Sequence, residues 1–211
     1  EVAGRAFGER FYPHISGVAQ SFNYYPLAYL RPQDGIVNLG FGLGKYVVEG
    51  GKAYRFCPAY PQLDMLVPAE QLRATQTRFF ALDLGRKAVD LLHGEDATLL
   101  DLEIAEAERD GSLTHCASTW DFQDDRLRDG LDVPGPRIVN FRNVLKYDQF
   151  PLAAILKRSL ELMRDAMETP VEIEFAVDLS PDPRNGKPTF FLLQVKHQLM
   201  DCAEVNLDRS E

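Results

Sequence analysis

The chain has 211 residues, of which 45% are hydrophobic and 26% are charged, and its formal net charge is -9. A chain of this size and composition can bury a substantial core, which excludes a disordered protein and indicates one large domain or two small ones. The acidic balance argues against extended nucleic-acid binding, because that depends on neutralising backbone phosphates with Lys and Arg. An acidic protein that binds a polyphosphate needs a metal ion or a local basic patch.

The first 60 residues are expected to be rich in β-strands. Residues 17–23 alternate like a strand, as do residues 46–49, and residues 52–56 complete a hairpin after a glycine pair. Residues 40–45 read Gly-Phe-Gly-Leu-Gly-Lys, which is half of a dinucleotide-binding fingerprint without its third glycine. A tight turn or a close backbone approach explains these glycines equally well.

The middle of the chain, residues 56–150, is too long and too apolar to be a flexible connection. Apolar side chains at three- and four-residue steps predict a helix over residues 68–93. Residues 96–104 and 111–122 are expected to be strands, joined by a charged turn at residues 106–110. We expect residues 96–141 to form extra strands that are attached to the main sheet or packed beside it.

The last part of the chain has the clearest periodicity. A one-sided apolar stripe predicts a helix over residues 151–167. It is followed by an alternating strand, residues 171–177, and a second strand, residues 190–196, across a turn rich in Pro, Asn and Gly. The sequence therefore predicts a helix that leads into a β-hairpin.

The predicted hairpin carries an unusual set of polar residues. Glu172 and Glu174 share the face of their strand opposite to the apolar residues, and two neighbouring carboxylates repel unless a cation lies beside them. On the second strand, Gln194 and Lys196 also share one face. Together the four supply oxygen ligands that suit Mg²⁺ and a cation that suits a phosphate. The alternative is an ordinary amphipathic hairpin with a polar outer face.

A register condition decides whether the four residues meet. A two-residue turn at Asn185-Gly186 would place Glu174 opposite His197 and would put Gln194 and Lys196 on the other face. A shared site therefore requires an odd-length loop or a bulge, which we expect within residues 181–188.

Several segments, taken in order, resemble the nucleotide-binding part of phosphoenolpyruvate synthase and pyruvate, phosphate dikinase, which has an ATP-grasp fold. Residues 16–23 resemble the family's Ser-Gly-Val strand, and residues 42–50 are similar to its Gly-Leu-Gly-Glu, Val-Val and Gly segment. Residues 172–176 resemble the Asp-Ile-Glu strand, and residues 192–196 resemble Leu-Gln-Thr-Arg. The resemblance covers residues 1–55 and 150–200.

This resemblance implies an α+β fold, an ATP-grasp-like subdomain with a mostly antiparallel sheet flanked by helices. It implies that Glu174 and Gln194 hold Mg²⁺ on ATP and that residues 56–150 are an elaborated insertion. The nucleotide-binding residues that it implies are Ser16, Gly17, Lys45, Glu172 and Lys196. Glu172 stands where the family has Asp, Lys196 where it has Arg, and Lys45 where it has Glu.

Two functions remain open from the sequence. In the first, residues 1–211 are the C-terminal ATP-grasp subdomain of a dikinase-like phosphotransferase, which binds Mg-ATP for phosphoryl transfer to a His on another domain. Its partners would be the missing N-terminal ATP-grasp subdomain and the phosphohistidine domain of a parent chain, and the absence of an initiating Met favours such a fragment. In the second, the chain is a non-catalytic module that binds a protein partner or a neighbouring domain.

The cellular setting is predicted from what the sequence lacks. Cys57, Cys116 and Cys202 are odd in number and far apart, as expected for free thiols in a reducing cytoplasm. No apolar run approaches the length of a membrane span, and the first residues lack the pattern of a signal peptide. We expect a cytoplasmic protein that binds neither membranes nor nucleic acid.

Overall fold

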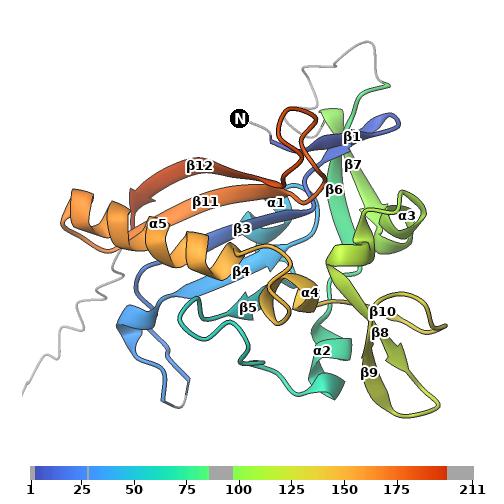
Figure 1. Cartoon of the computed structure of the whole chain (residues 1–211), viewed down its shortest axis with the longest axis horizontal. Coiled ribbons are helices and arrows are strands. Elements are labelled where there is room, and N and C mark those ends of the chain that lie inside the picture. The colour runs from blue at the N-terminus through green and yellow to red at the C-terminus, as the bar shows by residue number, and fades with distance from the viewer. Residues whose placement is uncertain (1–2, 28, 86–96, 199–211) are drawn as a thin grey trace, which may run out of the picture.

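The main sheet joins the early part of the chain to its end, as a computed structural model shows for residues 3–27, 29–85 and 97–198 (Figure 1). Its five strands are antiparallel and lie in the order β12-β11-β3-β4-β5. Their bounds are Ile15–Gln20 for β3, Ile36–Gly40 for β4, Tyr54–Phe56 for β5, Val171–Asp178 for β11 and Thr189–His197 for β12. The hairpin of β11 and β12 thus pairs with a strand from the first 20 residues.

Two smaller antiparallel sheets lie beside the main sheet (Figure 1). One has the order β1-β2-β6-β7, with bounds Arg5–Phe7, Arg10–Tyr12, Arg78–Asp83 and Leu99–Glu103. The other has the order β10-β8-β9, with bounds Arg137–Val139, Ala117–Asp121 and Arg126–Asp129. The expectation that the middle section forms extra strands beside the main sheet is confirmed for its described residues.

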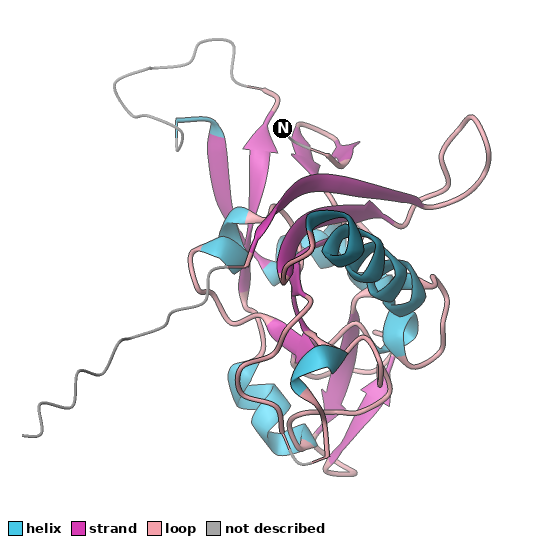
Figure 2. Ribbon diagram, turned by 90° about the vertical axis from the view of Figure 1, so that its left-hand side faces the viewer, coloured by secondary structure: helices cyan, strands magenta, loops and turns pink. Residues whose placement is uncertain are grey.

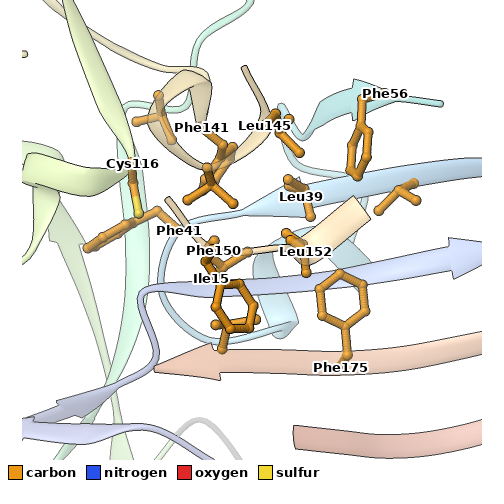
Figure 3. Packing of buried hydrophobic residues seen from close by; sticks show 14 of the residues in the cluster. Ile15, Leu39, Phe41, Phe56, Cys116, Phe141, Leu145, Phe150, Leu152 and Phe175 are labelled. Carbon is orange, nitrogen blue, oxygen red and sulfur yellow. The ribbon is translucent and has the colours of Figure 1, made fainter. Parts of the chain in front are cut away.

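One long helix, α5 (Leu152–Met167), covers one face of the main sheet (Figure 2). Leu152, Leu156 and Leu160 are its buried residues, and their three- and four-residue spacing is the stripe that predicted this helix. They belong to the same core as Ile173 and Phe175 of β11. Figure 3 shows Leu152 and Phe175 packed with residues of β3 and β4. Because side chains alternate along β11, Glu172 and Glu174 point to the opposite face.

The remaining helices are short. They are α1 (Lys45–Val48), α2 (Pro68–Ala74), α3 (Ile104–Arg109) and α4 (Arg142–Leu145), with 3-10 turns at Pro32–Asp34 and Leu113–His115. The described residues therefore form a mixed α and β protein with antiparallel sheets and few helices. No helix among them has the length and apolar character required to cross a membrane.

Several local predictions were wrong. Of the strand predicted over residues 46–49, residues 46–48 belong to the helix α1, in which Val47 packs over Gly40, where a Cβ would lie 2.7 Å from its Cγ2. The hairpin predicted between this segment and residues 52–56 therefore does not form, and β5 pairs with β4 instead. The helix predicted over residues 68–93 ends at Ala74. Residues 78–83 form β6, in which Phe79 and Ala81 alternate into the core, and residues 86–93 lie outside the described part of the chain.

The charged turn predicted at residues 106–110 lies largely within the helix α3. Its buried residues are Ile104 and Ala107, three positions apart, so the segment has an apolar side that packs on the core. The charged residues occupy the other side, where Glu106 accepts a hydrogen bond from Arg10 at 2.9 Å. A charge-rich segment of this kind is helical because of two apolar residues and their tertiary contacts.

Candidate functional site

The four polar residues predicted to share a face do so. Glu172 lies directly opposite Lys196, and Glu174 lies directly opposite Gln194, so the side chains of each pair point to the same side of the sheet. The register then shifts, because Phe175 pairs with Leu192 and leaves Leu193 as an extra residue. The bulge that the prediction required is therefore present. It lies within β12, whereas the sequence predicted it within residues 181–188.

Lys196 is the cation that makes the acidic pair tolerable. Its Nζ lies 2.8 Å from Glu172 Oε1 and 3.1 Å from Glu174 Oε1. The hydrogen bond to Glu172 is the main cause that raises the pKa of Lys196 above its ordinary value, and the hydrogen bond to Glu174 adds to it. On its other side, Glu172 accepts a hydrogen bond from Gln20 Nε2 at 2.6 Å. Both carboxylates are thus held by N–H donors.

The strand pairing extends this cluster into two rows that cross the sheet. The first row runs through Gln194, Glu174, Val18, Asn38 and Arg55, each directly opposite the next. Arg55 Nε donates to Asn38 Oδ1 at 3.2 Å. Because Arg55 lies three strands from Glu174, the row separates them by about 14 Å. A second row contains Lys196, Glu172, Gln20 and Ile36.

A pocket of about 810 Å³ lies over these rows. The main sheet forms the floor of the pocket. Glu172, Glu174 and Lys196 line one part of this floor, and Asn38 and Arg55 line another part. Other lining residues come from the loop after β3, from α1 and the glycine pair that follows it, from α2 and from the end of β10, and they include Tyr25, Leu27, Val47, Gly51, Gln71 and Thr75. The volume is in the range of small-molecule sites.

None of the other predicted site residues is among the described lining of this pocket. Ser16 is buried in β3, and its hydroxyl has no hydrogen-bond partner among the described residues. The ring of Phe175 lies against Gly17, where a Cβ would be 2.7 Å from its Cζ. Lys45 contacts Glu49 at 3.0 Å and lies over the ring of Phe80. Gln194 is exposed on the edge strand.

Gly17 therefore has a packing role that the sequence did not reveal. It faces the core side of the sheet, where the Phe175 ring occupies the space that a side chain would fill. Lys45, in turn, is not brought together with the acidic pair. Neither position lies on the floor that carries Glu172, Glu174 and Lys196.

Sequence reasoning missed three residues of the floor: Gln20, Asn38 and Arg55. Asn38 stands between the buried residues Val37 and Leu39, and this alternation is the signal that would have placed it on the polar face of a strand. Its neighbours across the sheet depend on strand order, which links β3 to β11 over more than 150 residues. No local pattern contains that information.

The donor set fits a hard cation held together with a phosphate ligand. Among the described residues there is no cluster of three or more His, Cys, Asp or Glu that would hold a metal alone. Mg²⁺ is commonly bound through one or two carboxylates plus substrate phosphates, and Glu172, Glu174 and the amide oxygen of Gln194 supply such a partial set. Lys196 and Arg55 add positive charge at two points of the floor.

The sequence matches no protein-family model and no curated protein.

Proposed function

We propose that the pocket binds Mg-ATP and that the chain is the ATP-grasp-like, nucleotide-binding part of a phosphotransferase related to phosphoenolpyruvate synthase and pyruvate, phosphate dikinase. The observation that supports this most is the register of the hairpin. It gathers two carboxylates, an amide and a lysine on one face, in the order of the family motifs that residues 172–176 and 192–196 resemble. A β-bulge at Leu193 is needed to achieve it.

In this proposal the polar residues of the sheet have different roles according to their charge. Glu174 and Gln194 would hold Mg²⁺, which would neutralise the charge of the triphosphate. Lys196 bridges both carboxylates, and its ammonium group would be able to bind a phosphate oxygen if Mg²⁺ compensated the charge of the acids. Arg55 lies at the other end of the row, where its guanidinium can contact a second phosphate. Catalysis would then consist of positioning and charge neutralisation, with the phosphoryl group passing to a His on another domain.

A second candidate function is a non-catalytic module that binds a protein partner. The observation that favours it is the exposure of large apolar residues near the pocket mouth: Tyr25 is 88% exposed and Leu27 is 53% exposed, although both line the pocket. Tyr29, 66% exposed, lies against Tyr60 with the ring centroids 5.9 Å apart. Aromatic residues of this kind are enriched at interfaces.

Calorimetric titration with ATP, with and without Mg²⁺, tests the first proposal. We expect this chain to bind ATP weakly and only with Mg²⁺. The side chains of Tyr25 and Leu27 at the mouth are exposed, so they do not enclose the pocket against water. A longer protein that also supplies the opposing subdomain should bind more tightly. The double variant Glu174→Gln with Gln194→Ala should lose the Mg²⁺-dependent component in both.

The matched control is Asp165→Asn, on the exposed side of α5, which should bind as the wild type does. Binding of ATP that is equally strong without Mg²⁺, or that survives the double variant, contradicts the metal assignment. Absence of ATP binding in the longer protein favours the protein-binding module.

A further inference from the structure

A buried histidine lies where the sheet of β1 and β2 meets the main sheet. His14 stands between β2 and β3, and its side chain is 3% exposed. Its backbone N–H donates to the carbonyl oxygen of Val177 at 3.0 Å, which fixes it beside the end of β11. The ring of Phe7, on β1, meets the imidazole edge-on, with the ring centroids 5.6 Å apart. A titratable ring is thus enclosed between β1 and β11.

Two groups at the end of β11 compete for one nitrogen of this ring. The backbone N–H of Leu179 donates to His14 Nδ1 at 3.2 Å. Asp178 Oδ1 lies 3.1 Å from the same nitrogen. A ring nitrogen either accepts through its lone pair or donates through a proton, and it cannot do both. His14 Nδ1 can therefore bind Leu179 only without a proton, and it can donate to Asp178 only with one.

The bond to Leu179 corresponds to the neutral ring with its proton on Nε2. The backbone hydrogen of Leu179 lies in the plane of its peptide and is directed at Nδ1, so Nδ1 has to present its lone pair. In the imidazolium form both ring nitrogens carry protons and neither accepts. Protonation of His14 is therefore incompatible with the bond to Leu179, and the carboxylate of Asp178 is in place to receive the new donor.

The other titratable groups around His14 keep one charge state near neutral pH. Although burial opposes the ionisation of Asp178, hydrogen bonds hold its pKa below the ordinary value. Arg5, which donates to Asp178 Oδ2 at 3.0 Å, stays charged. Burial raises the pKa values of Tyr12 and of Cys116, whose Sγ donates to the carbonyl oxygen of His14 at 3.5 Å. Histidine is the side chain that ordinarily changes charge between pH 5 and 8.

The bond to Leu179 holds the start of the loop that joins the two strands of the hairpin. This loop, residues 179–188, leaves β11 after Asp178 and enters β12 at Thr189, which pairs with Asp178. Arg5 Nη2 also holds it, by donating to the carbonyl oxygen of Pro181 at 2.8 Å. Because the charge of Arg5 is constant, the contact made by His14 is the one that responds to pH in this range.

We propose that His14 is a pH-sensitive latch, a side chain that holds the start of the β11–β12 loop in one protonation state only. In the neutral form Nδ1 binds the backbone N–H of Leu179. In the protonated form the imidazolium pairs with Asp178 and releases Leu179, which loosens the start of the loop while the two strands stay paired. The latch does not depend on any ligand of the pocket.

NMR spectroscopy of the isotopically labelled chain between pH 5 and 8 tests this inference. The nitrogen resonances of His14 report whether Nδ1 carries a proton, and we expect none at pH 8 and one at pH 5. The amide proton of Leu179 should shift upfield with the same midpoint as the ring. Its hydrogen-exchange protection, corrected for the intrinsic effect of pH on exchange, should fall about five- to tenfold on acidification, as expected for the loss of one hydrogen bond.

Two variants separate the partners of the ring. His14→Asn replaces the ring with an amide whose oxygen can accept from Leu179 at every pH, so the pH dependence of the Leu179 amide should disappear. Asp178→Asn keeps the ring but removes the carboxylate, so the midpoint of the His14 titration should fall by about one pH unit or more. The matched control is His197→Asn, at an exposed position on β12, which should change neither signal.

The wild-type protein gives a result even if a variant does not fold, because the ring and the Leu179 amide are measured in one sample. A proton on Nδ1 already at pH 8, a ring that stays neutral down to pH 5, or a Leu179 amide that does not follow the ring overturns the inference. A pH dependence of the Leu179 amide that persists in folded His14→Asn also overturns it, since the change would then originate from another group.

Discussion

Glu174 lies directly opposite Gln194 across the β11–β12 pair, and the next residue pair is already out of step. Phe190, four residues before Gln194, packs against Phe175 with the ring centroids 5.5 Å apart, on the core side of the sheet. In a regular strand, residues four apart would share a face. The extra residue Leu193 allows β12 to bury Phe190 and still present Gln194 and Lys196 beside the two acids.

Lys196→Met should make stability less sensitive to alkaline pH. The folded-state pKa of Lys196 is raised, so its ion pairs contribute fully below its unfolded pKa of about 10.4 and are lost as the pH rises through the folded value. Urea unfolding from pH 7 to 11.5 should show a difference between wild type and variant that is constant up to about pH 10 and shrinks above it. Because Lys196 is nearly half exposed, the neutral-pH loss should be less than about 1 kcal/mol.

The control for this experiment is Lys157→Met, at an exposed position on α5. Its difference from the wild type should not change with pH in the same window. A difference for Lys196→Met that grows above pH 10 would contradict the assigned role of Lys196 as the cation of the acidic pair.

The helix α5 and the hairpin could be predicted from sequence because each is specified by its own periodicity. The stripe of Leu152, Leu156 and Leu160 and the alternation of residues 171–177 both match the structure. The sequence predicted that the four polar residues share a face only if a bulge or an odd-length loop shifts the register. The bulge that meets this condition lies at Leu193, and the neighbouring sequence does not distinguish this position from one in a regular strand.

The rest of the site depends on contacts between distant segments. Residues 46–48 have the composition of a strand but belong to α1, which packs over the strands β3 and β4 instead of extending them. Asn38 and Arg55 join the floor through the pairing of β3 with β4 and of β4 with β5.

Gly17→Ala should destabilise the protein, although it adds only one methyl group and changes no charge. An added Cβ would lie 2.6 Å from the carbonyl oxygen of Asn38 and 2.7 Å from Phe175 Cζ, so the ring or the strand has to shift. We expect a loss of about 1–3 kcal/mol in the free energy of unfolding, measured with urea. Gly44→Ala is the control, since its Cβ would meet only Ser16 at 3.8 Å and should change stability by less than about 0.5 kcal/mol.

An unchanged midpoint for Gly17→Ala would show that the glycine is not needed for packing against Phe175. That result would favour the nucleotide-binding role of Gly17 that the family resemblance implies.

Glu168→Gly should stabilise the protein. Glu168 ends α5 in a left-handed conformation with φ 53°, which glycine adopts without steric cost. We expect a gain of about 1 kcal/mol in thermal or urea unfolding. Glu161→Gly, in the interior of the same helix, is the matched control and should lose about 1 kcal/mol. A loss for both variants would mean that the left-handed cap carries no strain that glycine relieves.

Asp178→Asn should remove a stabilising contribution that disappears in acid. Asp178 is 7% exposed, and although burial opposes ionisation, hydrogen bonds from His14, the backbone N–H of Ser180 and Arg5 hold its pKa below the ordinary value. Arg5 Nε lies 3.0 Å from Asp178 Oδ2, so the contact ties β1 to the end of β11. The contribution of a group with a lowered folded-state pKa is present above its unfolded pKa of about 3.9 and is lost as the pH falls through the folded value.

Urea unfolding of wild type and Asp178→Asn between pH 2 and 7 measures this contribution. At neutral pH the variant should be less stable by about 1–3 kcal/mol, the range for a buried hydrogen-bonded group that loses its charge. The difference should shrink below about pH 4 and be smallest at the acid end, where Asp178 is protonated in both states of the wild type. Asp165→Asn, at an exposed position, should follow the wild type throughout. A difference that stays constant down to pH 2 would show that Asp178 stabilises the strand by packing and not by its charge.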